Sequence, residues 1–196
     1  KDRLYTSMAS SRARRSAQTV MMEVLQAMAK LLAPILTFTA EEVWLALPPC
    51  PGKPESVHLT QFPEVNPVFV RPDLAETWKT LVAVKGEAAK AIEAARQNKV
   101  VGHSLDAAVE VAAPEPLRAM LETHQDDLRA LLIVSDLRVV EGQGIANAYR
   151  SADIPGLVVG VSRAKGGKCH RCWNYSSTVG ESRKHPTLCA RCLENL

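Results

Sequence analysis

Apolar residues in the first part of the chain recur at helical spacing. They form two neighbouring stripes, made of Val20, Val24, Met28, Leu31 and Ile35 and of Met21, Leu25, Met28 and Leu32. A helix that is apolar over so wide an arc is expected to be buried in a bundle. Pro34 interrupts the pattern, and the run from Thr39 to Glu42 has the form of a capping box that begins a short helix ending at Leu47. The pattern predicts a helix, a corner and a second helix.

A proline-rich segment separates these helices from a second long one. Residues 48–72 contain seven prolines and leave room for a short strand near 57–60 at most. Pro72 suits the first turn of a helix that continues to Asn98. Trp44 and Trp78 lie in the apolar stripes of their helices, so we expect both to be core residues.

Beyond residue 98 the period of the apolar pattern changes to two. Alternation in 107–111, 137–139 and 157–161 predicts three strands, and the two segments between the first two strands, 116–124 and 126–132, have helical patterns. The fold class is therefore α+β: a helical bundle, a small α+β part with a short sheet, and a cysteine module. The predicted domains are residues 1–98, 99–164 and 165–196.

Four cysteines near the end of the chain have the spacing of metal ligands. The pairs Cys169/Cys172 and Cys189/Cys192 are each separated by two residues, with sixteen residues between the pairs. Four thiolates at this spacing predict one structural Zn²⁺ in tetrahedral coordination. A ligand set in which His170 or His185 replaces a cysteine remains an alternative. The chain starts without a signal-peptide pattern, which favours a reducing, cytoplasmic location over disulfides.

Charge is distributed unevenly along the chain. The net charge is +3, but the segment from residue 163 onward holds seven Lys/Arg and two acidic residues, while residues 1–162 hold 17 Lys/Arg and 19 acidic residues. A compact basic module favours a polyanionic partner such as nucleic acid, although basic residues in small zinc modules also serve solubility. No apolar run has the length of a membrane span, so no membrane partner is expected.

Several stretches of the chain form a pattern found in one known family. The stretches are Asp2-Arg3-Leu4-Tyr5, Arg14-Arg15-Ser16-Ala17-Gln18-Thr19, the run from Ala33 to Trp44, the spacing of Arg96, Lys99, Gly102, Ser104, Leu105 and Ala107, and the two cysteine pairs. Together they resemble class I aminoacyl-tRNA synthetases, and specifically the C-terminal region of the bacterial-type isoleucyl-tRNA synthetase family. The run from Ala33 to Trp44 is shared with valyl and leucyl relatives. The terminal finger, with Cys169-x-Arg171-Cys172-Trp173, is similar to that of the isoleucyl family. The resemblance covers nearly the whole chain.

The resemblance implies a helical anticodon-binding domain, a junction and a zinc finger that together position tRNA(Ile) for ATP-dependent, AMP-forming aminoacylation. The family's catalytic motifs, H-x-G-H and K-M-S-K-S, do not occur in these 196 residues, so no catalytic residue is assigned. ATP and Mg²⁺ are expected only in the full-length enzyme. The implied partner is tRNA(Ile) rather than DNA, and the implied state is a monomer.

Candidate tRNA contacts combine an aromatic residue with nearby cations, and they are Trp173, Arg171, Lys168, Arg191 and Arg15. Trp173 follows a cysteine in a module too small to bury an indole fully, so we expect partial exposure and stacking on an unpaired base. The alternative is a tryptophan packed over the zinc site. Gly166 and Gly167 suggest a flexible tether before the finger.

Two other functions remain open from the sequence. A similar finger closes the formamidopyrimidine-DNA glycosylases, but these rely on an N-terminal proline followed by a glutamate, which Lys1 and Asp2 do not supply. The finger could also be a purely structural knuckle. On a helix, Arg12 and Arg15 share a face and Arg14 points elsewhere, so at least one of the three is expected to be a solvated surface charge.

Overall fold

The structure is a computed structural model that describes residues 2–142, 144–145 and 148–196. Lys1, which the comparison with the glycosylases uses, lies outside the described residues. The chain forms two compact units, 1–70 and 71–196. The predicted boundaries at 98 and 164 stay a prediction. None of the helices in the described residues has the length and apolarity of a membrane span.

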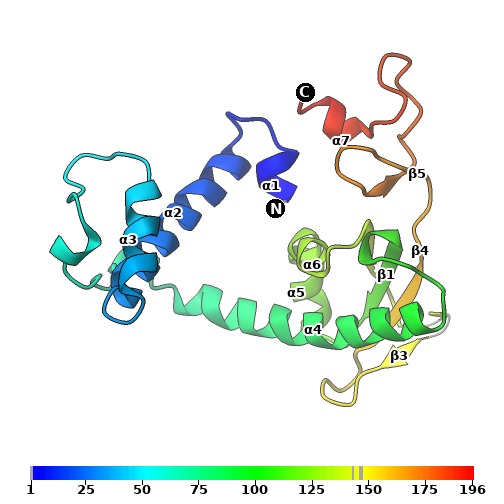
Figure 1. Cartoon of the computed structure of the whole chain (residues 1–196). Coiled ribbons are helices and arrows are strands. Elements are labelled where there is room, and N and C mark those ends of the chain that lie inside the picture. Colours follow the sequence, from blue (N-terminus) through cyan, green and yellow to red (C-terminus); the bar gives the residue numbers. More distant parts are fainter. Residues whose placement is uncertain (1, 143, 146–147) are drawn as a thin grey trace. The chain divides into compact units, whose positions relative to one another are not determined.

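The first unit is helical, as predicted, and contains α1 (Asp2–Tyr5), α2 (Arg12–Leu32), α3 (Thr37–Ala46) and the 3₁₀ turns η1 (Val57–Leu59) and η2 (Pro67–Phe69) (Figure 1). Ser11 caps α2 by accepting a hydrogen bond from the backbone N–H of Arg14 at 3.3 Å. The helix ends at Leu32, two residues before Pro34, which confirms the predicted corner. A small core gathers Ala29, Ala33, Ala40, Trp44, Leu47 and Val57.

Trp44 is a core residue, as predicted. Its side chain is 3% exposed, and its indole N–H donates to the carbonyl oxygen of Pro54 at 2.9 Å. This bond ties α3 to the proline-rich segment. The N–H that burial would otherwise leave unpaired is thereby satisfied.

The prediction that α2 is buried over a wide arc is wrong for the described residues. Val20 is 61% exposed, Val24 51% and Leu31 52%. Only the side of α2 that carries Ala29 is covered, because α3 and η1 pack there. The periodic pattern identified the apolar face correctly, but it did not say how much of that face the chain itself covers.

Two local predictions in this unit are also wrong. The second helix begins at Thr37 rather than at a capping box on Thr39, and no side chain caps its first turn. Residues 57–59 form a 3₁₀ turn instead of a strand. Glu41 nevertheless acts as a cap, because its carboxylate accepts from the Ser56 hydroxyl at 3.0 Å and from the backbone N–H of Val57 at 2.9 Å. Both partners lie in the segment that follows α3, outside the helix that carries Glu41.

The second unit combines helices with two sheets. It contains α4 (Pro72–Gln97), η3 (Ser104–Asp106), β1 (Ala107–Ala112), α5 (Leu117–Thr123), α6 (Gln125–Leu132), β2 (Asp136–Val139), β3 (Tyr149–Arg150), β4 (Val158–Arg163), β5 (Gly167–Lys168), β6 (Tyr175–Ser176) and α7 (Ala190–Leu193). The three predicted strands are confirmed as β1, β2 and β4, and the two predicted short helices as α5 and α6. The sheet has the order β2-β1-β4-β3, with β1 parallel to β2 and antiparallel to β4.

One face of this sheet forms the main core. Val109, Val111, Leu137 and Val159 are all at most 2% exposed and pack with α4, α5 and α6. These helices lie along one side of the sheet (Figure 1). Leu81 and Val84 of α4 are fully buried there, whereas Trp78, predicted to be core, is 36% exposed. The α+β class is confirmed.

A buried carboxylate joins α4 to the short strand β3, which the sequence pattern did not predict. Glu87 is 4% exposed and accepts hydrogen bonds from the Tyr149 hydroxyl at 2.9 Å, the Ser151 hydroxyl at 2.5 Å and the Lys90 ammonium at 2.5 Å. The Lys90 and Ser151 hydrogen bonds, the largest contributions, lower the pKa of Glu87 to about 2. The carboxylate is therefore ionised at neutral pH and fully partnered.

Candidate metal centre and nucleic-acid interface

The four cysteines come together from two turns at the end of the second unit. Cys169 and Cys172 follow strand β5, and the backbone N–H of Cys169 pairs with the carbonyl oxygen of Asn174 at 2.9 Å to close the first turn. Cys189 is the N-cap of α7, and Cys192 lies within this helix. The four sulfur atoms lie within 4.8 Å of one another.

This arrangement fits one zinc ion. Zinc–sulfur bonds of about 2.3 Å in a tetrahedron place sulfur atoms about 3.8 Å apart. The Cys172 and Cys189 sulfurs are 3.8 Å apart. Cys169, Cys189 and Cys192 are buried, and no histidine joins the cluster among the described residues. His170 is exposed. The four-cysteine cluster is consistent with one Zn²⁺, as the spacing predicted.

The pKa shifts of the thiols differ from one cysteine to the next. Burial raises the pKa of Cys169, but backbone N–H groups directed at its sulfur, led by that of Cys172, outweigh burial and lower the pKa to about 6. Burial raises the pKa of Cys189 and of Cys192. Neighbouring thiolates repel each other, so the whole set is deprotonated only when a cation compensates their charge.

Trp173 stands on the surface of the finger beside this centre. Its side chain is 58% exposed, which confirms the expected partial exposure and argues against an indole packed over the cysteines. The Lys168 ammonium lies 6.0 Å from the centre of the indole ring. The backbone of Trp173 is left-handed, with φ +66, while its N–H donates to the Cys169 carbonyl oxygen at 2.8 Å. A bulky residue in this conformation is unusual, and such strain is often retained where a side chain has a function.

The other predicted contacts lie in different surroundings. The Arg171 guanidinium donates from one nitrogen to the carbonyl oxygens of Cys192 and Asn195, both at 2.9 Å, and so holds the end of α7. Arg191 lies within α7. Arg15 is exposed on α2 in the first unit. A tRNA contact of these three residues stays a prediction, and for Arg171 the structure adds a role in holding the finger together.

Close packing accounts for the lack of a side chain at Gly166 and Gly167. A Cβ atom on Gly166 would lie 2.3 Å from the carbonyl group of Ser176, and one on Gly167 would lie 2.9 Å from the side chain of Val179. Gly166 therefore lets the backbone approach Ser176 of β6 closely, and Gly167 leaves room for the side chain of Val179. The expected flexibility of the tether stays a prediction.

Sequence reasoning missed Ser135, which joins the finger to the sheet. Its hydroxyl accepts from the backbone N–H of Tyr175 at 2.7 Å and donates to the carbonyl oxygen of Leu105 at 2.5 Å. The residue is 9% exposed. No local signal identifies it, because its partners lie 40 and 30 positions away in the sequence.

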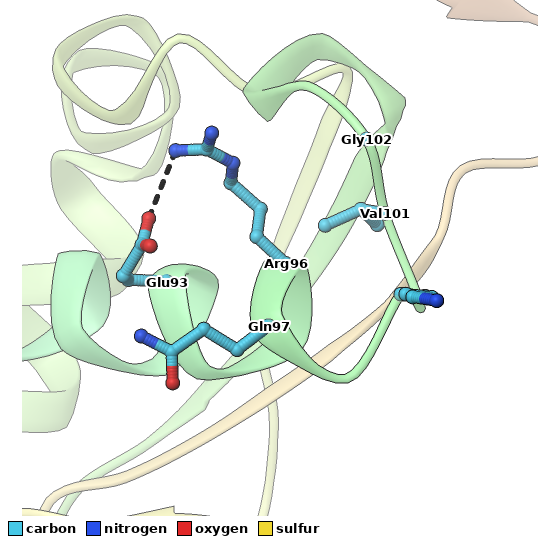
Figure 2. A pocket seen from close by; sticks show the side chains of 6 residues that line it. Glu93, Arg96, Gln97, Val101 and Gly102 are labelled. Carbon is cyan, nitrogen blue, oxygen red and sulfur yellow. Dashed lines mark hydrogen bonds and ion pairs between the residues drawn. The ribbon is translucent and has the colours of Figure 1, made fainter.

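A shallow pocket marks the end of α4, at residues that the resemblance singled out. Arg96 is paired with Glu93 at 2.9 Å. Gln97, Val101 and Gly102 lie around this pair (Figure 2). Lys99 also lines this pocket and is left-handed, with φ +58. This position closes the helix, because the backbone N–H of Val100 donates back to the carbonyl oxygen of Ala95 at 2.9 Å. This part of the motif therefore marks the end of α4.

The class of protein follows from comparisons with known families. Residues 1–111, more than half of the chain, match the family described as the anticodon-binding domain of tRNA ligase, and residues 166–195 match the zinc finger found in FPG and IleRS. The chain therefore belongs to the family of anticodon-binding domains of tRNA ligases.

The similar proteins narrow this class to isoleucine–tRNA ligases. The chain is 44% identical over 194 residues to the enzyme named isoleucine–tRNA ligase from Syntrophotalea carbinolica, covering 98% of this chain and 20% of the relative. The enzymes of the same name from Geobacter sulfurreducens and Moorella thermoacetica are 44% and 43% identical over 96% and 98% of this chain, which covers 20% and 21% of their lengths. The chain thus spans about a fifth of these relatives and corresponds to their anticodon-binding domain with its zinc finger.

Proposed function

We propose that this chain is the tRNA-recognising part of an isoleucine–tRNA ligase and that it binds the anticodon end of tRNA(Ile). The whole enzyme would carry out ATP-dependent aminoacylation in the cytoplasm as a monomer, through a catalytic region that these 196 residues do not include. Within this chain, Cys169, Cys172, Cys189 and Cys192 hold one structural Zn²⁺. The metal performs no chemistry and keeps the finger in shape.

This proposal rests on one observation: an exposed indole lies beside a cation on the surface of the finger. Trp173 is 58% exposed, and Lys168 lies 6.0 Å from its ring. An unpaired base stacks on such a ring, while a nearby ammonium attracts the adjoining phosphate. The segment around them carries the excess of positive charge. The family of the chain makes the anticodon loop of tRNA the natural source of an unpaired base.

A binding assay tests this proposal. Filter binding of the 196-residue chain to a tRNA transcript with an isoleucine anticodon is measured over a salt series, with and without a zinc chelator, and a DNA duplex serves as the competing substrate. Trp173→Ala is expected to weaken tRNA binding by about 1–3 kcal/mol while zinc is retained. Trp78→Ala, which removes an exposed tryptophan from α4, is the matched control and should change binding little.

The outcomes separate the candidate functions. Affinity that falls steeply with salt indicates phosphate contacts. Preference for duplex DNA would favour a glycosylase-like module. Unchanged tRNA binding by the Trp173 variant, or tRNA binding that ignores the chelator, would leave the finger as a structural knuckle and overturn the proposed role.

A further inference from the structure

The finger is joined to the sheet part of the second unit, residues 71–164, at two places. One is the chain itself, which leaves β4 at Arg163 and enters β5 at Gly167. The other is the Ser135 hydroxyl, which accepts from the backbone N–H of Tyr175 in β6 at 2.7 Å. Among the described residues of this unit, that is the only hydrogen bond between residues 166–195 and the sheet part.

Apolar packing contributes little to this attachment. The buried apolar cluster of the sheet part includes Leu81 and Val159, whereas the cluster of the finger is formed by its cysteines, and the two share no residue. A cavity of about 510 Å³ lies between the sheet and the finger hairpin, which β5 and β6 form, and Ser162 and Tyr175 line it from the two sides. The finger therefore faces the sheet across a cavity, without the close packing that fixes an orientation in a protein core.

Ser135 is itself held firmly by the sheet part. Its backbone N–H donates to the carbonyl oxygen of Ala107 at 3.1 Å, and its hydroxyl donates to the carbonyl oxygen of Leu105 at 2.5 Å. A serine hydroxyl has one proton to donate and two lone pairs that accept. Because the proton is directed at Leu105, a lone pair is left for the N–H of Tyr175, and both hydrogen bonds form together. The sheet part thus fixes the orientation of the group that the finger contacts.

A short hydrogen-bonded path leads from Ser135 to the exposed indole. Tyr175 pairs with Lys168 in the finger hairpin, and the Lys168 ammonium lies 6.0 Å from the centre of the Trp173 ring. The Cys169 N–H donates to the carbonyl oxygen of Asn174 at 2.9 Å, and the Trp173 N–H donates to that of Cys169 at 2.8 Å. The hairpin and the first cysteine turn therefore form one segment, and a rotation of the hairpin on the sheet would carry the indole with it.

We propose that Ser135 is a positioning residue, which holds the finger in one orientation on the sheet part and so presents Trp173 for stacking before tRNA binds. Without its hydroxyl, the finger keeps its zinc but is held to the sheet part by the chain segment 164–166. It then samples several orientations, and the apparent affinity for tRNA falls with the fraction that presents the indole correctly. The inference rests on the proposed function, because it concerns how the same contact is prepared.

Ser135→Ala in the whole chain tests this inference. Affinity for a tRNA transcript with an isoleucine anticodon is expected to fall by about three- to tenfold, the effect of one hydrogen bond on an equilibrium. Ser162→Ala removes an exposed hydroxyl that lines the same cavity from β4, and as the matched control it should change affinity by less than about twofold. Ser135→Thr retains the hydroxyl and should keep most of the affinity of the unsubstituted chain.

Two measurements without tRNA separate positioning from a general loss of structure. Zinc content and the hydrogen-exchange protection of β1 should be the same in Ser135→Ala and in the unsubstituted chain. NMR relaxation of the backbone amides should show residues 166–195 tumbling with the sheet part in the unsubstituted chain and faster than the sheet part in Ser135→Ala. Loss of zinc from this variant would show that Ser135 supports the metal site, and it would overturn the positioning role.

A double-mutant cycle with Trp173 tests whether Ser135 acts through the indole. If it does, Ser135→Ala weakens tRNA binding when the indole is present and has little further effect in the Trp173→Ala background. Losses that simply add, or a finger that still tumbles with the sheet part in Ser135→Ala, would overturn the positioning role and leave stacking on Trp173 standing. Unchanged tRNA binding by Trp173→Ala alone would overturn the proposed function and the positioning role together.

Discussion

The helix-covered sheet and the zinc finger belong to one unit, but different interactions stabilise their folds. The sheet part buries a cluster of apolar side chains that runs from Leu81 in α4 to Val159 in β4. In the finger, the buried cluster consists of Cys169, Cys189 and Cys192, with Cys172, Val179 and Leu188 beside it. A segment of about 30 residues is too small to bury a stabilising apolar core, so a metal takes its place.

Because of this difference, the shape of the finger depends on bound zinc, whereas the sheet part is held by its own apolar core. If the position of the exposed Trp173 depends on the finger, tRNA binding depends on zinc as well. The sheet part should fold without it. Perturbing each region separately therefore tests whether the finger and the sheet part fold independently of each other.

Removal of zinc should have the largest effect. A chelator, or Cys189→Ser, leaves thiols that cannot all be deprotonated together, and structural zinc contributes on the order of 10–16 kcal/mol of binding free energy in small fingers. We expect amide protection to be lost in residues 166–195 and retained in β1, measured by hydrogen exchange. Loss of protection in β1 at the same chelator concentration would show that the finger and the sheet form one cooperative structure.

Truncation of the apolar core should have the next largest effect, on the sheet part. Leu81 is 0% exposed, so Leu81→Ala is expected to destabilise the unit by about 2–5 kcal/mol, measured by denaturant unfolding. Leu74→Ala, in the same helix at a position that is 45% exposed, is the matched control and should cost far less. Zinc affinity should not change in either variant. A strong loss of zinc binding in the Leu81 variant would contradict the independence of the two regions.

The two long helices show how well the apolar pattern predicts burial. In α4 the pattern and the burial agree from Leu81 to Ala95 on the side that faces the sheet of the same unit, whereas Trp78 is 36% exposed. In α2 the same kind of pattern predicted burial, yet Val24 and Leu31 are about half exposed. Periodicity states which face of a helix is apolar, and the coverage of that face depends on partners that the local sequence does not contain.

The same distinction between local features and contacts with distant residues holds at the cysteine cluster. The cysteine spacing sufficed to predict the cluster, because each pair forms its own turn and the ligand chemistry is local. Partial exposure of Trp173 also followed from the size of the module. The bonds of Arg171 to the last turn and the bridge formed by Ser135 could not be predicted, because they join positions more than 20 residues apart.

A smaller effect should come from the backbone of the finger itself. Trp173 is left-handed, a conformation that glycine adopts without steric cost, so Trp173→Gly is expected to retain zinc and to stabilise the finger by about 1 kcal/mol relative to Trp173→Ala. Competition with a chromophoric zinc chelator measures this difference. Both variants should lose tRNA affinity alike. A glycine variant that binds zinc more weakly than the alanine variant would show that the indole itself supports the metal site.

A pH-dependent effect is expected in the sheet part and becomes most visible in acid. The hydrogen bonds from Lys90 and Ser151 lower the pKa of Glu87 to about 2, from an ordinary value of 4.5. When the pH falls, the unfolded chain therefore takes up a proton at this residue before the folded chain does. The stability contributed by Glu87 is complete above about pH 5 and is lost as the pH falls from there toward 2.

Glu87→Gln should accordingly lower the stability of the second unit at pH 7 and flatten its decline between pH 5 and pH 3, measured by thermal unfolding at each pH. Glu76→Gln is the control from the same helix, because its carboxylate is 76% exposed and pairs with Lys79 only at 3.7 Å. The control should follow the unsubstituted chain closely. If the Glu87 variant kept the full acid sensitivity, the buried carboxylate would not be its source, and the loss of the hydrogen bonds to Tyr149 and Ser151 would have to act through packing alone.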